Sequence, residues 1–296
     1  MQKPAPVYSK ELVFHPEQDT SYVHFENAAA NPFKPNPSSF ERVNAWWLAD
    51  CALLTYWDQA KAAPIFSTAG LQSKFVKVGS TDCYIAWQQD FVIVAFRGTE
   101  PDEWEDMLTD AKIKLLPWLA GKVHRGFKEA IDEIWPTLEP ELNSLAQTRT
   151  VWFCGHSLGA ALATLAAHRF PNTRGLCTFG LPRVGDNTFG TAFNAKLSAK
   201  TLRYVNHHDI VTHVPPPLFG YKHVELGRFI SANGTISVSA PSLIHFFGEL
   251  FETPQSLLDI IKAIETGTIQ TAPKALLEHM PKAYAIWTWN DYDANG

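Results

Sequence analysis

The sequence predicts an α/β fold with a mostly parallel central sheet and helices on both of its faces. Short apolar segments alternate with helical segments through the middle of the chain, an order typical of parallel sheets. Residues 91–96 are apolar at every position, as expected of a strand that is covered on both faces. Because we find no repeat and no linker, we expect a single domain over residues 1–296.

The same patterns place the remaining elements. Residues 1–38, rich in Pro, Asn and Ser, are expected to form an irregular N-terminal arm. Apolar spacing predicts a helix over 40–56 and another over 126–146, with a kink at Pro136. Short apolar runs predict strands at 74–78, 83–87, 150–155, 176–179 and 202–205. Residues 241–289 are strongly apolar and are expected to form a helical C-terminal portion.

Composition excludes several classes of function. The 296 residues carry a formal net charge of −5 and no basic run, which argues against nucleic acid as a partner. The four cysteines are too few and too scattered for a disulfide scaffold or a zinc site. We therefore expect neither a metal nor another cofactor.

Two features bear on location. Residues 1–17 contain prolines and charges but lack the apolar core of a secretory leader. No apolar run approaches the length that is needed to cross a bilayer. We expect a protein without a transmembrane segment, located in the cytoplasm, or secreted if a leader has been removed.

The motif Gly155-His-Ser157-Leu-Gly159 joins the strand predicted at 150–155 to an alanine-rich helix over 158–168. A serine at such a strand-to-helix corner is held in a tight turn with its hydroxyl exposed to substrate. The two glycines allow a close approach that a Cβ would block. The helix N-terminus favours negative charge, so Ser157 is predicted to be a nucleophile that develops an oxyanion.

A serine hydroxyl needs a histidine base that is oriented by a carboxylate. Asp186 and Asp209 both follow predicted strands, where catalytic groups of open α/β sheets collect. We favour Asp209 because Asn206 marks a turn directly after a strand. The alternative role for either aspartate is to stabilise a turn.

Four histidines after Asp209 are candidates for the base. His213 is too close in sequence to reach from a separate loop, and His223 is interpreted as a structural residue at the start of a strand. His245 lies within an apolar helical run, whereas His279 lies at a helix entry that Pro281 reshapes. We favour His279 over His245 because an irregular entry leaves the ring freer to reach the serine. His207 and His208, with Asp209 and His213, could also indicate a metal site, but adjacent histidines rarely share one ion.

Two further groups complete the predicted site. The N–H of Leu158 and that of Thr99, just after the strand at 91–96, are expected to form an oxyanion hole. Trp104, Met107 and Leu108 share one face of a predicted helix. That helix is either a lid over an acyl pocket or an ordinary surface helix.

These residues together resemble a known family, the class 3 (fungal-type) triacylglycerol lipases of the α/β-hydrolase fold. The resemblance is carried, in order, by Phe96-Arg-Gly-Thr, Val123-His-Arg-Gly-Phe127, Gly155-His-Ser-Leu-Gly159, Thr178-Phe-Gly-Leu-Pro-Arg-Val-Gly185 and Val205-Asn-His-His-Asp-Ile-Val211. It implies that Ser157 and Asp209 are nucleophile and acid, that Thr99 and Leu158 form the oxyanion hole and that the helix after Thr99 is a lid. The family's Asp-His motif followed by a tyrosine is matched loosely by Glu278-His279 and Tyr284.

The expected function is hydrolysis of lipid esters through an acyl-enzyme intermediate, with triacylglycerol as the first substrate class and a lipid–water interface as a possible place of action. Carboxylesterase, feruloyl esterase and phospholipase A1 activities fit the same residues. A hydrolase-like binding protein without turnover is the alternative from a different class.

Overall fold

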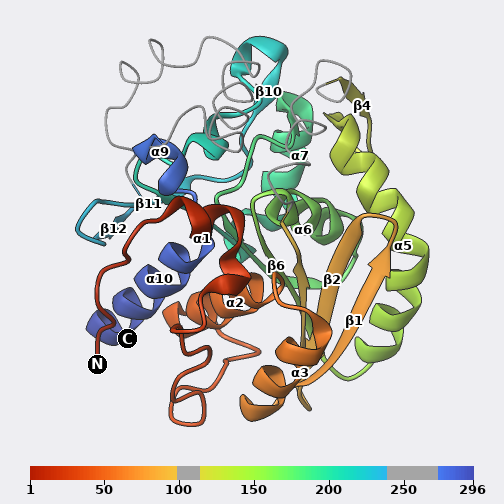
Figure 1. The fold of residues 1–296 in the computed structure, drawn as a ribbon. Helices are drawn as coiled ribbons and strands as arrows, with labels where there is room; N and C mark the ends of the chain where they lie inside the picture. Colours follow the sequence, from red (N-terminus) through yellow and green to blue (C-terminus); the bar gives the residue numbers. More distant parts are fainter. Residues whose placement is uncertain (99–113, 239–272) are drawn as a thin grey trace.

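The computed structural model describes residues 1–98, 114–238 and 273–296, and within them the chain builds an eight-stranded central sheet (Figure 1). The strands follow the order β1-β2-β3-β6-β7-β9-β11-β12. Their bounds are Gln72–Val78, Thr81–Trp87, Phe91–Phe96, Thr150–His156, Thr173–Phe179, Thr201–Asn206, Gly227–Ile230 and Ile236–Ser237, respectively.

The sheet is mostly parallel, as the alternating sequence pattern predicts. β3, β6, β7, β9 and β11 pair in parallel, so their carboxyl ends lie along one edge. β1 and β2 precede them as an antiparallel pair, and β2 also runs antiparallel to β3. All six residues of β3 are buried, which agrees with its uninterrupted apolar sequence.

Helices cover both faces of the sheet (Figure 1). α2 (Arg42–Leu54) packs against β3, β6 and β7, and α10 (Pro281–Asn295) packs against α2. On the other face α6 (Leu158–Arg169) packs against the same three strands, with α5 (Arg125–Leu145) beside it. The alanines of α6 are buried and let the helix approach the sheet closely. α5 continues through Pro136 and Pro140, so neither proline ends the helix.

Shorter elements connect these layers. α3 (Gln59–Thr68) packs against β1, and α7 (Asn187–Leu197) packs against α6. Short 3₁₀ turns occur at Pro16–Gln18 (η1), Ser198–Lys200 (η3), Ile210–His213 (η4) and Pro217–Phe219 (η5).

A second sheet, which the sequence did not predict, lies beside the carboxyl edge of the first. Its strands follow the order β10-β8-β5-β4, with bounds Tyr221–Lys222, Gly185–Asp186, Lys122–His124 and Leu115–Pro117. His223 therefore follows β10 instead of beginning a strand. Strands of two or three residues are too short to show the alternation by which strands are recognised.

The N-terminal arm is more ordered than its composition predicts. It contains the short helix α1 (Lys10–Phe14), and Phe25 and Phe33 are buried in the main core. The arm thus covers α2. The prediction of an irregular segment over residues 1–38 is wrong for α1 and for the buried residues Phe25 and Phe33.

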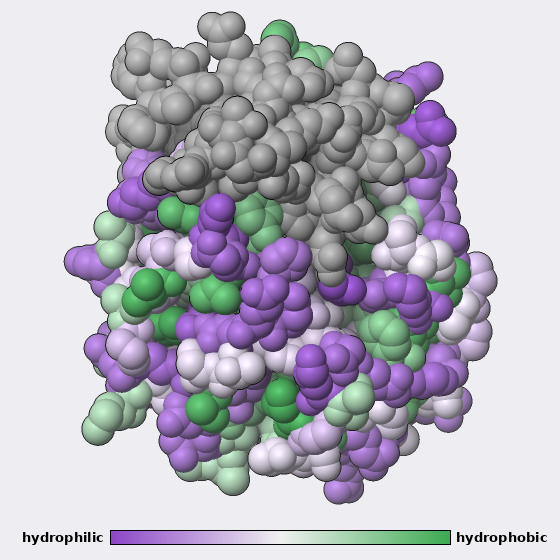
Figure 2. Space-filling view, viewed as in Figure 1, coloured by the Kyte–Doolittle hydropathy of each residue, from purple (hydrophilic) through white to green (hydrophobic). Residues whose placement is uncertain are grey.

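The described part of the helical C-terminal portion comprises α9 (Lys274–Leu277) and α10, which continues past residue 289 to Asn295. Residues 241–272 of that portion lie outside the described residues. Among the described helices, none is long and apolar enough to span a membrane. In the coloured part of Figure 2, hydrophobic residues are scattered among hydrophilic ones.

Candidate active site

A sharp turn between β6 and α6 carries Ser157. Its backbone angles, φ 57° and ψ −127°, lie in a region that residues with a side chain rarely adopt. This geometry matches a strained strand-to-helix corner that projects a nucleophile.

Two glycines make the turn possible. A Cβ on Gly155 would lie 2.3 Å from the carbonyl carbon of Gly159. A Cβ on Gly159 would lie 2.2 Å from the carbonyl oxygen of Phe96. Both contacts are with backbone atoms that cannot rotate away, so the motif needs glycine at each position.

The side chain of Ser157 is buried, with 1% of its surface exposed. Its backbone N–H donates to the carbonyl of Phe179 at 3.0 Å, which ties the turn to the end of β7. Its Oγ has no hydrogen-bond partner among the described residues. Leu158 opens α6, and the first N–H groups of a helix lack an acceptor within the helix. The N–H of Leu158 can therefore serve a developing oxyanion.

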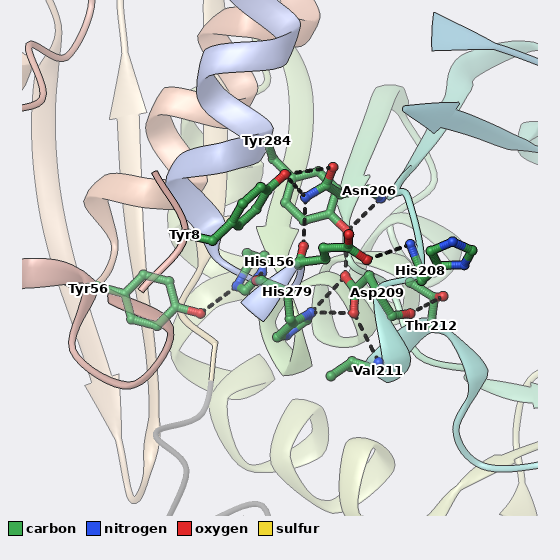
Figure 3. A network of polar contacts seen from close by, with 11 residues as sticks. Tyr8, Tyr56, His156, Asn206, His208, Asp209, Val211, Thr212, His279 and Tyr284 are labelled. Carbon is green, nitrogen blue, oxygen red and sulfur yellow. Dashed lines mark hydrogen bonds and ion pairs between the residues drawn. The ribbon is translucent and has the colours of Figure 1, made fainter. Parts of the chain in front are cut away.

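Asp209 and His279 form a buried pair beyond the carboxyl end of β9 (Figure 3). Nδ1 of His279 lies 2.9 Å from Oδ1 and 2.8 Å from Oδ2 of Asp209. Both side chains are at most 1% exposed. His279 lies in the short connection between α9 and α10, the irregular helix entry by which it was selected from the sequence.

Other donors fix the carboxylate of Asp209. The N–H of Val211 donates to Oδ1 at 3.0 Å, and the hydroxyl of Tyr284 donates to Oδ2. Burial, followed by the charge of Asp209, raises the pKa of Tyr284 well above 10, so its hydroxyl keeps the proton that it donates. The same hydroxyl accepts from the N–H of Asn206 at 3.0 Å.

Gly180 links the pair to the nucleophile turn. It directly follows Phe179, whose carbonyl binds the N–H of Ser157. A Cβ on Gly180 would lie 2.7 Å from Cε1 of His279 and 2.9 Å from Oδ2 of Asp209. Ser157, His279 and Asp209 therefore surround the end of one strand, although they lie far apart in the sequence.

Glu278 holds the segment that carries His279, a role that the sequence, where Glu278 appears only in the loose Asp-His match, did not indicate. Oε1 of Glu278 lies 2.8 Å from Nδ1 of His207, and Oε2 accepts from the N–H of His208 at 2.9 Å. Nδ2 of Asn206 donates to the carbonyl of Glu278 at 2.7 Å. The end of β9 thus fixes both the acid and the segment next to the base.

The alternative candidates have other surroundings. Asp186 caps the N-terminus of α7 by accepting from the N–H of Phe189 at 2.8 Å. Nε2 of His223 lies 2.6 Å from the carbonyl oxygen of Thr212, and burial lowers the pKa of His213 to about 4. His245 lies outside the described residues. Within residues 1–98, 114–238 and 273–296, no group of three or more His, Cys, Asp or Glu side chains could hold a metal.

His156, interpreted from the sequence as structural, makes two buried contacts. Its Nδ1 lies 2.7 Å from the hydroxyl of Tyr56, and its Nε2 lies 2.7 Å from the carbonyl oxygen of His279 (Figure 3). Burial, followed by the positive charge that His279 can carry, lowers the pKa of His156 well below 6.5. No sequence pattern pointed to Tyr56, because it lies about 100 residues from its partner.

The other predicted residues lie outside the described part of the chain. These are Thr99 of the oxyanion hole and Trp104, Met107 and Leu108 of the lid. Gly98, the residue before Thr99, is described. A Cβ there would lie 2.0 Å from the hydroxyl of Tyr56, so the strand end that leads to Thr99 passes directly over this tyrosine.

Comparison with known families agrees with this architecture. Residues 93–219, which contain the Ser157 turn and Asp209, match the family "Lipase (class 3)". Over these residues the chain is similar to the class 3 lipases. The region includes most of β3 and all of β6, β7 and β9. It ends before His279, so the family match leaves the assignment of the base as a prediction.

The relatives that match this class 3 lipase region include lipases from fungi. A lipase from Rhizopus niveus is 31% identical over 166 residues, which are 51% of this chain and 41% of that protein. A secreted mono- and diacylglycerol lipase from Fusarium solani is 37% identical over 110 residues, 34% of this chain and 32% of that protein. The chain therefore spans less than half the length of these relatives.

Solved structures agree on the fold. The triacylglyceride lipase of Rhizomucor miehei superimposes on this chain with a TM-score of 0.57 at 23% identity. The superimposed part covers 68% of this chain and 88% of the lipase. The likeness supports an α/β-hydrolase fold for the class 3 lipase region. The expected cytoplasmic location finds no support among these relatives, because the Fusarium solani protein is a secreted one.

Proposed function

We propose that this protein is a serine hydrolase that cleaves carboxylic esters of lipids through an acyl-enzyme intermediate. The observation that carries the proposal is the buried Asp209–His279 pair, 2.8 Å apart, beside the strained turn of Ser157. A histidine whose Nδ1–H is held by a carboxylate presents Nε2 as a proton acceptor. Such a base is what a serine hydroxyl requires to attack an ester.

The proposed reaction has two steps. His279 takes the proton of Ser157 as Oγ attacks the ester carbonyl, and it returns that proton to the leaving alcohol. Water then attacks the acyl-serine while His279 takes one of its protons. The bond between the acyl carbon and Oγ breaks, the fatty acid leaves, and His279 returns the proton to Oγ of Ser157. In both steps the N–H of Leu158, together with that of Thr99, stabilises the negative oxygen. Each such donor contributes about 3 kcal/mol to transition-state stabilisation.

Ser157 and His279 must come together during this reaction. Ser157 Oγ has no hydrogen-bond partner among the described residues. Catalytic hydrogen bonds of unliganded enzymes are often long and tighten only when substrate binds. The proposal therefore requires that substrate draws Oγ and Nε2 within hydrogen-bonding distance.

We propose glycerol esters of fatty acids as the substrate class, with triacylglycerol first. Support comes from the lipase relatives, one of which is named for mono- and diacylglycerols. Action at a lipid–water interface, with a lid formed by residues 101–108, is part of the same proposal. Location in the cytoplasm or outside the cell stays a prediction.

Labelling with a fluorophosphonate tests the nucleophile. One label per molecule on Ser157, with loss of p-nitrophenyl ester hydrolysis, is the expected result. Ser157→Ala should abolish labelling and lower kcat on the order of 10⁶-fold, while circular dichroism stays unchanged. An unlabelled parent protein that hydrolyses no ester would instead indicate a binding protein that has the fold without turnover.

A panel of substrates then separates the related activities. Triolein, a feruloyl ester, phosphatidylcholine and p-nitrophenyl esters of increasing chain length are compared by kcat/KM. We expect long-chain glycerol esters to be preferred. A preference for the feruloyl ester or for the sn-1 ester of phosphatidylcholine would replace the lipase proposal with the corresponding esterase or phospholipase.

A further inference from the structure

His156 joins three parts of the proposed site that are distant in sequence. It is the last residue of β6, directly before Ser157, and its ring is buried. One ring nitrogen contacts Tyr56 and the other contacts the main chain of His279, each at 2.7 Å (Figure 3). We infer that His156 is a positioning residue, which holds the base His279 at a fixed place relative to the nucleophile. The inference rests on the proposed function.

The two contacts define the tautomer of His156. A carbonyl oxygen can only accept, so Nε2 of His156 must carry the hydrogen that is donated to His279. In a neutral imidazole the other nitrogen is then an acceptor, and Nδ1 accepts from the hydroxyl of Tyr56. Both polar atoms of the buried ring are thereby satisfied, which leaves the ring a single orientation.

The same ring lies beside the base. The ring centroids of His156 and His279 are 4.3 Å apart, with 34° between the ring planes. During the reaction His279 becomes an imidazolium, and a second cation at that distance would oppose this change. A neutral His156 does not repel the imidazolium of His279, whereas a lysine or arginine at position 156 would.

Tyr56 extends the connection toward the predicted oxyanion hole. Its hydroxyl lies so close to Gly98 that a Cβ there would be 2.0 Å away. Gly98 directly precedes Thr99, so a displaced Tyr56 would disturb the backbone that leads to that donor. Through His156 and Tyr56, the nucleophile turn, the base and the end of β3 therefore share one set of contacts.

A positioning role makes a different prediction from a purely structural one. A displacement of a catalytic group by about 1 Å can cost on the order of 100-fold in rate. Loss of the contact should therefore lower kcat of the folded enzyme and leave KM nearly unchanged. A structural role would lower the melting temperature without changing kcat per folded molecule.

The chain allows a matched pair of substitutions. In His156→Gln the side-chain amide nitrogen reaches the place of Nε2, so it can still donate to the carbonyl of His279. In His156→Asn the same amide is one carbon shorter and ends near the place of Nδ1. His168 supplies the control, because it is also buried but lies near the far end of α6, on the order of 15 Å from Ser157 along the helix.

The four variants are His156→Gln, His156→Asn, His168→Gln and His168→Asn. We would measure kcat per folded molecule and KM of each with a soluble p-nitrophenyl ester. His156→Gln should keep kcat within about 5-fold of the parent, and His156→Asn should lose about 10- to 100-fold with KM changed less than 3-fold. Gln and Asn at position 168 should behave alike. Equal kcat for His156→Gln and His156→Asn would overturn the inference.

A second readout does not depend on turnover. The Nδ1–H of His279, hydrogen-bonded to Asp209, should give a downfield proton NMR signal that persists in His156→Gln and broadens or disappears in His156→Asn. If the parent hydrolyses no ester but the signal follows this order, the proposed function fails while the positioning role stands. An unchanged signal in both variants counts against the positioning role.

If His156→Asn does not fold, Tyr56→Phe takes its place, since it deletes one hydroxyl and leaves Nδ1 of His156 without its donor. A loss of kcat of about 3-fold or more, with KM unchanged, would support the inference. Parental kcat in Tyr56→Phe would contradict it.

Discussion

The carboxylate of Asp209 has more hydrogen-bond donors around it than a surface turn would need. Nδ1 of His279, the N–H of Val211 and the hydroxyl of Tyr284 all donate to it. Hydrogen bonds to both of its oxygens fix this carboxylate in one orientation. It can therefore orient His279 and offset the positive charge that the imidazole gains during catalysis.

Replacing Asp209 by Asn tests this role. The amide can still accept from Val211, so the fold should be kept. Its NH₂ cannot accept from Nδ1–H of His279, which favours the tautomer with hydrogen on Nε2 and removes the base. We expect kcat to fall about 10⁴-fold, measured with a soluble ester, while the melting temperature changes little. Full activity in Asp209→Asn would rule this aspartate out as the acid.

Among the elements of the site, α6 packs closely against the end of β3. A Cβ on Gly159 would lie 2.2 Å from the carbonyl oxygen of Phe96 and 2.8 Å from that of Arg97. Helix and strand therefore touch through their backbones, and this contact sets where the N-terminus of α6 points. The sequence predicted the need for both glycines of the motif, but not which strand the helix would touch.

Gly159→Ala should therefore damage both stability and activity. The added methyl group must push α6 away from β3, at a cost of about 1–3 kcal/mol in the free energy of unfolding. Gly190→Ala in α7 is the matched control, because its Cβ would meet its nearest neighbour, the carbonyl of His223, at 3.4 Å. That variant should gain roughly 0.5–1 kcal/mol from the better helix former. Urea unfolding checks both values, and equal effects at the two positions would contradict the argument.

A buried carboxyl group joins the N-terminal arm to α2. Asp50 accepts from the hydroxyl of Tyr22 at 2.6 Å and from the N–H of Phe25 at 2.5 Å. Burial is the largest influence on this group and raises its pKa to about 7, against the lowering effect of these two donors. The folded protein therefore holds a proton on Asp50 at pH values where the unfolded chain has released it.

The sign of the resulting pH dependence follows from linkage. An unfolded aspartate titrates near pH 4, so stability due to Asp50 is complete below that value and is lost as pH rises to about 7. The loss is on the order of 4 kcal/mol, since one pKa unit corresponds to about 1.4 kcal/mol. Asp50→Asn mimics the protonated form and should flatten the decline between pH 4 and 7. Urea unfolding at several pH values measures it, and identical pH profiles for parent and variant would refute it.

Across the whole molecule, the sequence predicted the parts that long apolar patterns encode. β3 has the predicted bounds, 91–96, and β6 and α6 differ from theirs by one residue. The mostly parallel direction of the strands followed from their alternation with helices. The arm was predicted less well, because Phe25 and Phe33 enter the core without periodic spacing. The single-domain organisation stays a prediction.

In the candidate site, residues marked by a local pattern were predicted, and contacts between distant segments were not. Ser157 is marked by its local motif, and Asp209 by the strand before it. Contacts such as Tyr56 with His156 or Glu278 with His207 join residues that are 100 and 71 positions apart. No local pattern encodes pairs of this kind, since they exist only after the chain has folded.

The lid, a prediction about the whole molecule, can be tested by comparing dissolved and emulsified substrate. The predicted lid residues Trp104, Met107 and Leu108 lie outside the described residues, so a lid stays a prediction from their apolar spacing. If an apolar helix covers the site in water, a lipid surface should stabilise the uncovered form, because it removes that apolar face from water.

Tributyrin hydrolysis should then rise abruptly once the ester exceeds its solubility and forms an emulsion. A fully soluble acetate ester, measured over the same concentration range, should show simple saturation. A smooth saturation curve for tributyrin through its solubility limit would contradict a lid that opens at an interface.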